Sequence, residues 1–345
     1  MRTSAAGEGS VTDLCARIGS VELPNPVMTA AGTGGHGAEL GAFFDLSCLG
    51  AVVVKSLSVA PWPGNPPPRV CPVPGGMLNG VGLQGPGIDA WAASDLPGLA
   101  SSGARIVVSI WGRRIEEYAE AAERLAGVLE RAGGDIVACE VNISCPNLED
   151  RSRMFAHSPT ATAAAIAASK ACGLPLWAKL SPNTSDLVEI AGAALEAGAE
   201  GLTLVNTLLG LAIDETTRRV VLGAGGGGLS GPALHSVALR AVFECASAYP
   251  EAPIVGVGGI SDGAGAMRML LAGASAVQVG TATLADPRAP ARVLAELRQM
   301  FDTAGVASLA EVVGAAHASV AAPASVAAPA SVAERPEETG HDGGH

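Results

Sequence analysis

The chain has 345 residues, of which 48% are hydrophobic and 16% are charged, and it carries a formal net charge of −12. The apolar fraction excludes an intrinsically disordered chain, and the acidic balance without a basic patch argues against nucleic-acid binding. The sequence shows no signal-peptide pattern and no apolar run of about 18 residues, the length needed to span a membrane. We therefore expect a soluble, cytoplasmic protein that binds neither nucleic acid nor membranes.

The numbers and positions of the cysteines and lysines indicate which residues are candidates for a functional role. The seven cysteines form no CxxC pair, and this odd number without a secretion signal predicts free thiols rather than a disulfide framework or a zinc site. The 21 basic residues divide into 18 arginines and three lysines, which are Lys55, Lys170 and Lys179. Lysine is a compact charge that can lose its proton when buried, unlike arginine. Each lysine is therefore a candidate functional residue.

Eight short, apolar and β-branched runs alternate with Ala/Leu/Glu-rich stretches along the chain. Their hydrophobicity is continuous, which is typical of parallel strands that are buried on both faces. The runs predict strands within residues 26–32, 51–56, 104–110, 135–144, 174–181, 201–207, 252–259 and 275–282. The intervening pattern and its flanking glycines predict helices over 115–133, 160–173, 185–199 and 263–274.

This repeat predicts an α/β fold, a (β/α)8 TIM barrel, with a doubly wound open sheet as the alternative. The segment "GSVELPNPV" predicts a small N-terminal β hairpin that caps the bottom of the barrel. Residues 59–97 are long and rich in Pro and Gly. Because this segment follows the second strand, it predicts a functional loop over the barrel mouth.

The same pattern divides the chain into three parts. Residues 1–13 are expected to be a flexible N-terminus, and residues 14–314 to form the barrel. Residues 315–345 repeat "ASVAAP" and predict a disordered, low-complexity tail. The two histidines in that tail, His341 and His345, are expected to be solvated rather than bound to a metal.

Polar residues follow the predicted strands at the barrel end where active sites form. Cys145 of "VNISCPN" lies at one such end, and taken alone an apolar-flanked cysteine is more often a small core residue than a reactive one. A lysine at a strand end can likewise reach solvent without a function. Their shared position on one barrel face favours a common site. The other members of the set are Lys55, Ser56, Ser109, Asn142, Ser144, Asn147, Lys179, Asn206 and Thr207.

Glycine-rich loops indicate what occupies this site. The segments "GVGGISDG" and "QVGTA" follow the seventh and eighth strands, where barrels of this type bind phosphate through backbone N–H groups. A phosphate site with an internal lysine suits flavin mononucleotide (FMN), whose ring gains negative charge on reduction beside Lys179. Converging asparagines could read the alternating N–H and C=O groups of a cyclic imide. Lys55 could then hold an anionic substituent on that ring.

Ten ordered motifs over residues 14–300 resemble the dihydroorotate dehydrogenase family, the FMN enzymes of pyrimidine biosynthesis. They include "LPNPVMTAAGTGG", "VVVKSLS", "GNPPPRV", "GGMLNGVGLQGPG", "VNISCPN" and "WAKLSPN", followed by "LVNTLLG", "GGLSGPA", "VGVGGI" and "VQVGTA". The resemblance implies oxidation of (S)-dihydroorotate to orotate, with Cys145 as the base that takes the C5 proton and the flavin N5 taking the C6 hydride.

The resemblance also implies which residues surround each bound group. It implies substrate contacts from Lys55, Asn79, Gly82, Leu83, Asn142, Asn147, Asn206 and Thr207. It implies FMN contacts from Ala31, Gly32, Lys55, Ser56, Asn142, Lys179, Val205, Gly231, Gly258, Gly259, Gly280 and Thr281.

The cysteine base and the motif "GGMLNGVGLQGPG" resemble the class 1B catalytic subunits most. Such subunits pair with an electron-transfer subunit that carries FAD and an iron–sulfur cluster and passes electrons to NAD, and they form a homodimeric core. Gly85 departs from the family, which usually has asparagine there. Gly35-His36 stands where an aromatic residue is more usual, and the bulky Trp111 follows the third strand. These departures leave open a dihydropyrimidine dehydrogenase-like or specialised enzyme acting on a related cyclic imide. A non-catalytic flavin-binding barrel is a further alternative.

Overall fold

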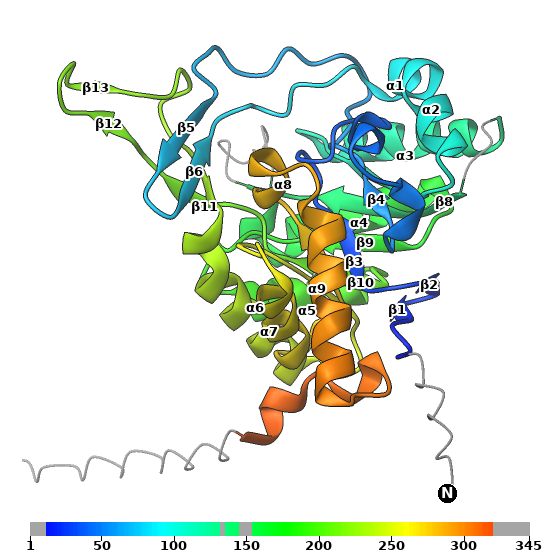
Figure 1. Ribbon diagram of the computed structural model, residues 1–345. Helices are drawn as coiled ribbons and strands as arrows, with labels where there is room; N and C mark the ends of the chain where they lie inside the picture. The colour runs from blue at the N-terminus through cyan, green and yellow to red at the C-terminus, as the bar shows by residue number, and fades with distance from the viewer. Residues whose placement is uncertain (1–11, 132–134, 145–153, 320–345) are drawn as a thin grey trace, which may run out of the picture.

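The computed structural model describes residues 12–131, 135–144 and 154–319, and eight parallel strands form its centre (Figure 1). Their order around the sheet is β3-β16-β15-β10-β9-β8-β7-β4, and a parallel bridge between Met28 and Ala51 joins the two outer strands. The predicted TIM barrel is therefore confirmed, and the open sheet is excluded. The strands are β3 (Val27–Thr29), β4 (Val52–Val53), β7 (Arg105–Ile110), β8 (Asp135–Asn142), β9 (Leu176–Lys179), β10 (Gly201–Leu204), β15 (Ile254–Val257) and β16 (Ala276–Val279).

Helices surround this sheet because each presents one apolar stripe to it. In α3 the buried side chains recur at helical spacing, from Tyr118 through Ala122 and Leu125 to Val128. The four predicted helices are found as α3 (Ile115–Leu129), α4 (Pro159–Ser169), α5 (Leu187–Glu196) and α7 (Gly263–Leu271). The other helices described are α1 (Ile88–Ser94), α2 (Leu96–Ser101), α6 (His235–Ala248), α8 (Ala282–Ala285) and α9 (Ala289–Ala304).

The predicted hairpin lies at the amino-terminal end of the barrel strands. Strands β1 (Ala16–Ile18) and β2 (Val21–Leu23) pair antiparallel, and both Ile18 and Leu23 are buried. A Cβ atom on Gly201, the first residue of β10, would lie 2.6 Å from Cγ2 of Ile18. The hairpin therefore closes the bottom of the barrel, and the functional end is the opposite one.

The segment expected as a long loop contains regular structure, which corrects that expectation. Strands β5 (Val70–Val73) and β6 (Gly76–Asn79) form a hairpin, and α1 occupies part of the rest. The hairpin pairs with β14 (Gly227–Ser230), which in turn pairs with β11 (Leu208–Gly210). Pairing with a strand that is some 150 positions away explains why local composition did not reveal it. Beyond this sheet a second hairpin, β12 (Ile213–Asp214) and β13 (Arg219–Val220), projects from the molecule (Figure 1).

Both ends of the described chain pack against the bottom half of the molecule. Asp13 forms a parallel bridge with Ser308, and the 3₁₀ helix Ala315–Ser319 follows. His317 in that helix stacks on Phe243 of α6 with ring centroids 4.0 Å apart. The first five residues of the predicted tail are therefore helical. The remaining 3₁₀ helices are Glu39–Ala42, Leu46–Cys48, Phe155–His157, Lys170–Cys172, Pro232–Leu234 and Leu309–Glu311.

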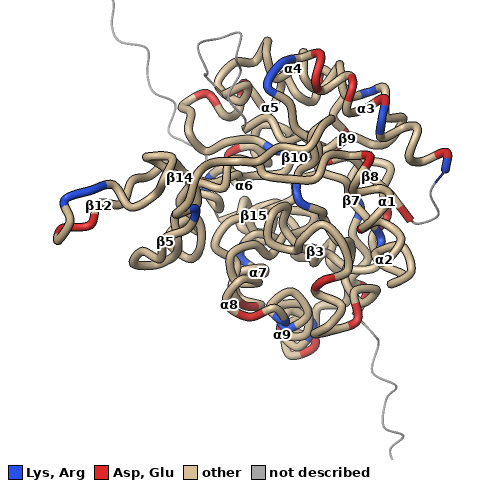
Figure 2. The backbone as a smooth tube through the Cα atoms, turned by 90° about the horizontal axis from the view of Figure 1, so that it is seen from above, with Lys and Arg blue, Asp and Glu red and all other residues tan. Residues whose placement is uncertain are grey.

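Charged residues are distributed mainly over the outer helices and the tip of the β12–β13 hairpin, whereas the barrel strands carry few (Figure 2). None of the helices described is both long and apolar enough to cross a membrane. The barrel strands that do carry charge therefore stand out, and Glu140 on β8 and Lys179 on β9 are both buried.

Candidate active site

A cavity of about 810 Å³ opens at the carboxyl ends of the barrel strands, beneath the β5–β6–β14–β11 sheet. Its floor and sides come from the ends of the strands, and its cover comes from Met77, Asn79 and the glycines 226–228. This is the end of the fold at which TIM barrels carry out chemistry. The cavity is therefore the candidate active site.

Of the strand-end set, Ser144 lines this cavity, whereas Ser109 does not and is buried behind it, with its hydroxyl 2.8 Å from that of Ser56. All described residues predicted to contact substrate or FMN line this one cavity. They are Ala31, Gly32, Lys55, Ser56, Asn79, Gly82, Leu83, Asn142, Lys179, Val205, Asn206, Thr207, Gly231, Gly258, Gly259, Gly280 and Thr281. The structure thus brings the predicted set together, while the binding role of each residue stays a prediction. Cys145 and Asn147 lie outside the described residues.

Two lysines give this cavity its charge. Lys55 and Lys179 line it, and no aspartate or glutamate is among its described lining residues. The third lysine, Lys170, is exposed in a 3₁₀ helix on the outside of the barrel. In a chain with a net charge of −12, a wall that holds two cations and no described anion favours anionic ligands.

Lys55 follows β4 and is tied to the loop that covers the site. Its Nζ donates to the carbonyl oxygen of Gln84. Gly82 and Leu83, just before, both have positive φ angles, of 70° and 58°, and such strain in a leucine is usual only where the surroundings impose it. Burial, and then the nearby Arg69 guanidinium, lower the pKa of Lys55 from its usual value. The loop and the lysine therefore form one rigid, cationic wall.

A chain of amides and hydroxyls forms another part of the lining. Asn142 ends β8, and its Nδ2 donates to Oγ of Ser56 at 3.3 Å while its Oδ1 accepts from Nδ2 of Asn206 at 3.2 Å. The Tyr118 hydroxyl donates to the carbonyl oxygen of Asn142 at 2.8 Å, which anchors the strand end to α3. These bonds fix the direction of both amides, so the wall presents donors and acceptors in a defined order.

Lys179 is held from below by two residues that sequence reasoning did not identify. Its Nζ donates to Oε1 of Glu140 at 3.1 Å and to Oε1 of Gln278 at 3.3 Å. Both partners are fully buried in the strands β8 and β16. Glu140 and Gln278 each stand alone in an apolar run, and a single polar residue there does not change the strand prediction. The sequence pattern therefore gives no reason to assign them to the site.

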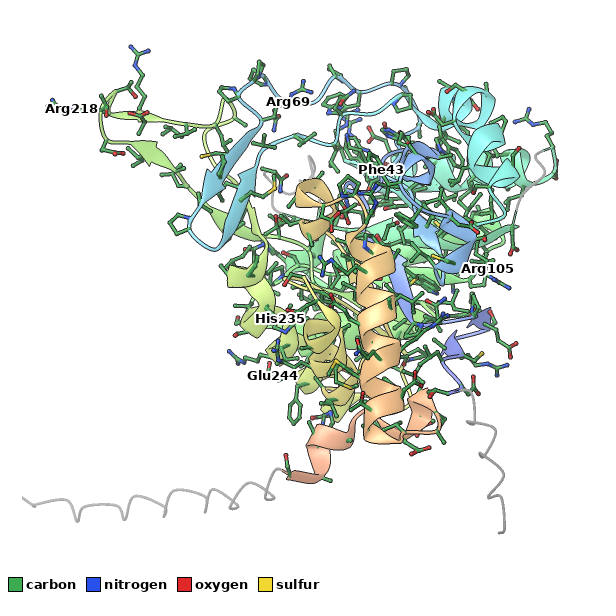
Figure 3. All side chains as sticks on the ribbon, in the orientation of Figure 1. Phe43, Arg69, Arg105, Arg218, His235 and Glu244 are labelled. Carbon is green, nitrogen blue, oxygen red and sulfur yellow. The ribbon has the colours of Figure 1, made fainter. Side chains whose placement is uncertain are left out.

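The remaining wall is backbone. Gly231, Gly258 and Gly259 have φ angles of 95°, 136° and 67°, which side chains rarely adopt. A Cβ atom on Gly259 would lie 2.7 Å from Cβ of His235, and His235 Nδ1 lies 3.0 Å from the carbonyl oxygen of Gly258. His235 is the first residue of α6 and is labelled in Figure 3. Only glycine fits here, so main-chain groups face the cavity, as a phosphate site requires.

Asn183 is a further site residue that the sequence analysis did not assign, although it belongs to the quoted motif "WAKLSPN". It lines the cavity, and its Nδ2 donates to the carbonyl oxygen of Thr207 at 2.9 Å. Its Oδ1 accepts from the backbone N–H of Leu209 at 2.8 Å. Asn183 therefore fastens the strand-end segment that carries Asn206 and Thr207.

The barrel and its amide-lined cavity with two lysines define an α/β-barrel protein whose cavity suits an anionic ligand. Comparison with known proteins narrows this class, because the profile described as dihydroorotate dehydrogenase matches residues 13–301. The chain belongs to the dihydroorotate dehydrogenase family and is an oxidoreductase.

Two relatives illustrate the match. A protein of Geobacter metallireducens is 44% identical over 304 residues, which cover 88% of this chain and 98% of the relative. A protein of Desulforudis audaxviator is 47% identical over 301 residues, which cover 87% of this chain and 96% of the relative. Both are named dihydroorotate dehydrogenase B (NAD(+)), catalytic subunit.

Proposed function

We propose that this chain oxidises (S)-dihydroorotate to orotate in pyrimidine biosynthesis, with FMN bound in the barrel cavity. The observation that carries the proposal is the convergence of Lys55, Lys179 and the amides of Asn142 and Asn206 around one cavity that has no described carboxylate in its lining. Family membership and the printed names of the relatives support the same reaction.

The glycine wall fits the phosphate of FMN. The backbone of Gly258 and Gly259 faces the cavity, with Gly280 and Thr281 beside it. The Thr281 hydroxyl donates to the Ser230 hydroxyl at 2.8 Å, which gives this wall a fixed polar edge. A doubly charged phosphate is stabilised by such backbone and hydroxyl donors.

Bound in this cavity, the flavin would supply the hydride acceptor for the oxidation. Lys179, at the floor of the cavity, would hold an ammonium against the ring, where negative charge develops on reduction. Ala31, Gly32 and Val205 would contact the rest of the ring system through backbone and small side chains.

The opposite half of the cavity fits the substrate. Lys55 would bind the carboxylate of dihydroorotate, and the backbone of Gly82 and Leu83 would close over it. Asn79, Asn142, Asn206 and Thr207 would read the N–H and C=O groups of its ring. Cys145, which lies outside the described residues, would take the C5 proton, and Asn147 would orient the ring beside it.

The two electrons that dihydroorotate would pass to the flavin must go on to a second acceptor. The relatives are named catalytic subunits that use NAD. We propose the corresponding partner for this chain, an electron-transfer subunit with FAD and an iron–sulfur cluster, bound to a homodimeric core. Among the described residues, no group of three or more His, Cys, Asp or Glu side chains could hold a metal ion.

Two measurements on purified protein test this function. Heat denaturation should release a flavin that chromatography identifies as FMN, in about one copy per chain. Addition of dihydroorotate with a dye as electron acceptor should form orotate, followed by its ultraviolet absorption. Release of FAD or of no flavin, or formation of no orotate from holoprotein, would contradict the proposal.

A further inference from the structure

A closed triangle of hydrogen bonds lies beneath the cavity floor. Besides the two bonds from Lys179, the Gln278 amide nitrogen Nε2 donates to Oε2 of Glu140 at 2.7 Å. Glu140 and Gln278 are both 0% exposed, and Lys179 is 5% exposed. Each of the three side chains therefore contacts the other two in the buried interior of the barrel.

The triangle spans the barrel interior rather than one strand pair. Asn142 pairs with Lys179 across β8 and β9, and Glu140 stands two residues earlier on the same face of β8. Gln278 comes from β16, which β10 and β15 separate from β9 in the sheet order. The side chains of three strands thus meet at the barrel axis, which fixes the position of each one.

Within the triangle, the ammonium group of Lys179 lies on the cavity side and the carboxylate of Glu140 lies behind it. Lys179 lines the cavity, whereas neither Glu140 nor Gln278 does. A lysine has three N–H donors, and in the described structure two of them are directed down to Glu140 and Gln278. The third donor is therefore available to a group in the cavity, with the carboxylate placed behind the ammonium.

A carboxylate in this position has a physical consequence. A buried charge is tolerated only when it is paired and hydrogen-bonded, and both Glu140 oxygens are. In a low-dielectric interior the two opposite charges act strongly on any group nearby. The carboxylate therefore offsets part of the positive potential that Lys179 exerts on the cavity.

We propose that Glu140 and Gln278 are positioning residues that fix the Lys179 ammonium against the flavin and set how strongly the site prefers reduced over oxidised flavin. This inference rests on the proposed FMN function. Removal of the carboxylate should leave the ammonium field uncompensated and favour the anionic reduced flavin. Removal of the ammonium should have the opposite effect.

The test is the reduction potential of the bound flavin in Glu140→Gln, Lys179→Met and the double variant. We expect Glu140→Gln to raise the ratio of affinities for reduced and oxidised FMN at least tenfold, which is a potential about 30 mV more positive. Lys179→Met should shift the potential to more negative values. In the Lys179→Met background the effect of Glu140→Gln should disappear, because a buried carboxyl group without its cationic partner is neutral, like the glutamine amide.

Control variants separate this role from a purely structural one. Glu244→Gln makes the same chemical change on the outer face of α6, where Glu244 pairs with Arg240, and it should leave the potential unchanged (Figure 3). If Glu140→Gln does not fold, Gln278→Met serves instead, and it should shift the potential only when Lys179 is present. Thermal unfolding of each holoprotein reports the structural cost separately from the potential.

Different results would contradict the FMN function and the positioning role of Glu140 and Gln278. A wild-type protein that binds no flavin would overturn the FMN function itself. A flavin whose potential is unchanged or more negative in Glu140→Gln, or shifts equally with and without Lys179, would overturn only the positioning role.

Discussion

A Cβ atom on Gly85 would lie 3.4 Å from Nε2 of His36, so the absence of a side chain at one residue makes room for the imidazole of the other. That nitrogen is buried and has no hydrogen-bond partner in the described structure. Both residues depart from the motifs of the family that the chain resembles. The structure therefore places these two departures next to each other, beside Gln84, whose carbonyl oxygen accepts from Lys55 Nζ.

The contact predicts a limit on the size of residue 85. Gly85→Leu should destabilise the protein by about 1–3 kcal/mol, the usual cost of overpacking a close contact, whereas Gly85→Ala should change stability little. Urea unfolding measures both. In a His36→Ala background most of the cost of Gly85→Leu should disappear, and a cost that stays the same there would show that the two positions are independent.

The environment of His36 predicts a pH dependence of stability. Burial first, and then the Lys55 charge, lower the pKa of His36, while Asp95 and Glu39 oppose this shift. As the pH falls below 6.5, the unfolded chain binds a proton that the folded protein still excludes, so the folded state loses stability. Stability should thus rise with pH between the lowered pKa and 6.5. His36→Gln should flatten this rise in urea unfolding at several pH values, and an unchanged slope would contradict the assignment.

If Lys55 binds the carboxylate of the substrate, its replacement should weaken the binding of orotate. Lys55→Met removes a charged hydrogen bond, typically about 1.5–3 kcal/mol, so the dissociation constant of orotate should rise by roughly ten- to hundredfold. The exposed Lys170→Met is the matched control and should bind orotate normally. Because burial and Arg69 lower the pKa of Lys55, orotate binding by the unmodified protein should begin to weaken at a pH below 10.5. Equal affinities in Lys55→Met and the control would refute a carboxylate contact.

The fold could be predicted in outline because its signals are local. Continuous apolar runs indicate all eight barrel strands, and the position of Lys55, Asn142 and Lys179 at strand ends is enough to predict that they share one site. Other features depend on distant pairing. The sheet of β5, β6, β14 and β11 joins Gly- and Pro-rich segments whose composition resembles a loop, and only contact between them makes them strands.

The site residues that the sequence did not indicate also depend on contacts between distant parts of the chain. Glu140 and Gln278 are single polar residues inside apolar strands, and nothing local shows that they meet Lys179 across the barrel. Asn183 follows a strand end, as the predicted residues do, so the rule that found Lys179 could have found it too. The binding roles assigned to the cavity residues stay predictions, as does the role of Cys145.

If Cys145 is the base that takes the C5 proton, the rate of flavin reduction should depend on pH and on the thiol. A free thiol ionises near pH ~8.5, so flavin reduction by dihydroorotate should accelerate as the pH rises toward that value. Cys145→Ser should slow flavin reduction sharply at neutral pH and keep the cofactor bound, because a hydroxyl ionises far less readily than a thiol and so offers almost no anionic base. Stopped-flow absorbance measures the rate, with the exposed Cys15→Ser as control. An unchanged rate in Cys145→Ser would assign the proton transfer to another group.

The most direct test of the proposed function is anaerobic mixing of the purified holoprotein with dihydroorotate, dihydrouracil or buffer. Dihydroorotate alone should bleach the visible absorption of the flavin, because only this ring carries the carboxylate that Lys55 would bind. Bleaching by dihydrouracil instead, or by neither compound, would contradict the proposed function.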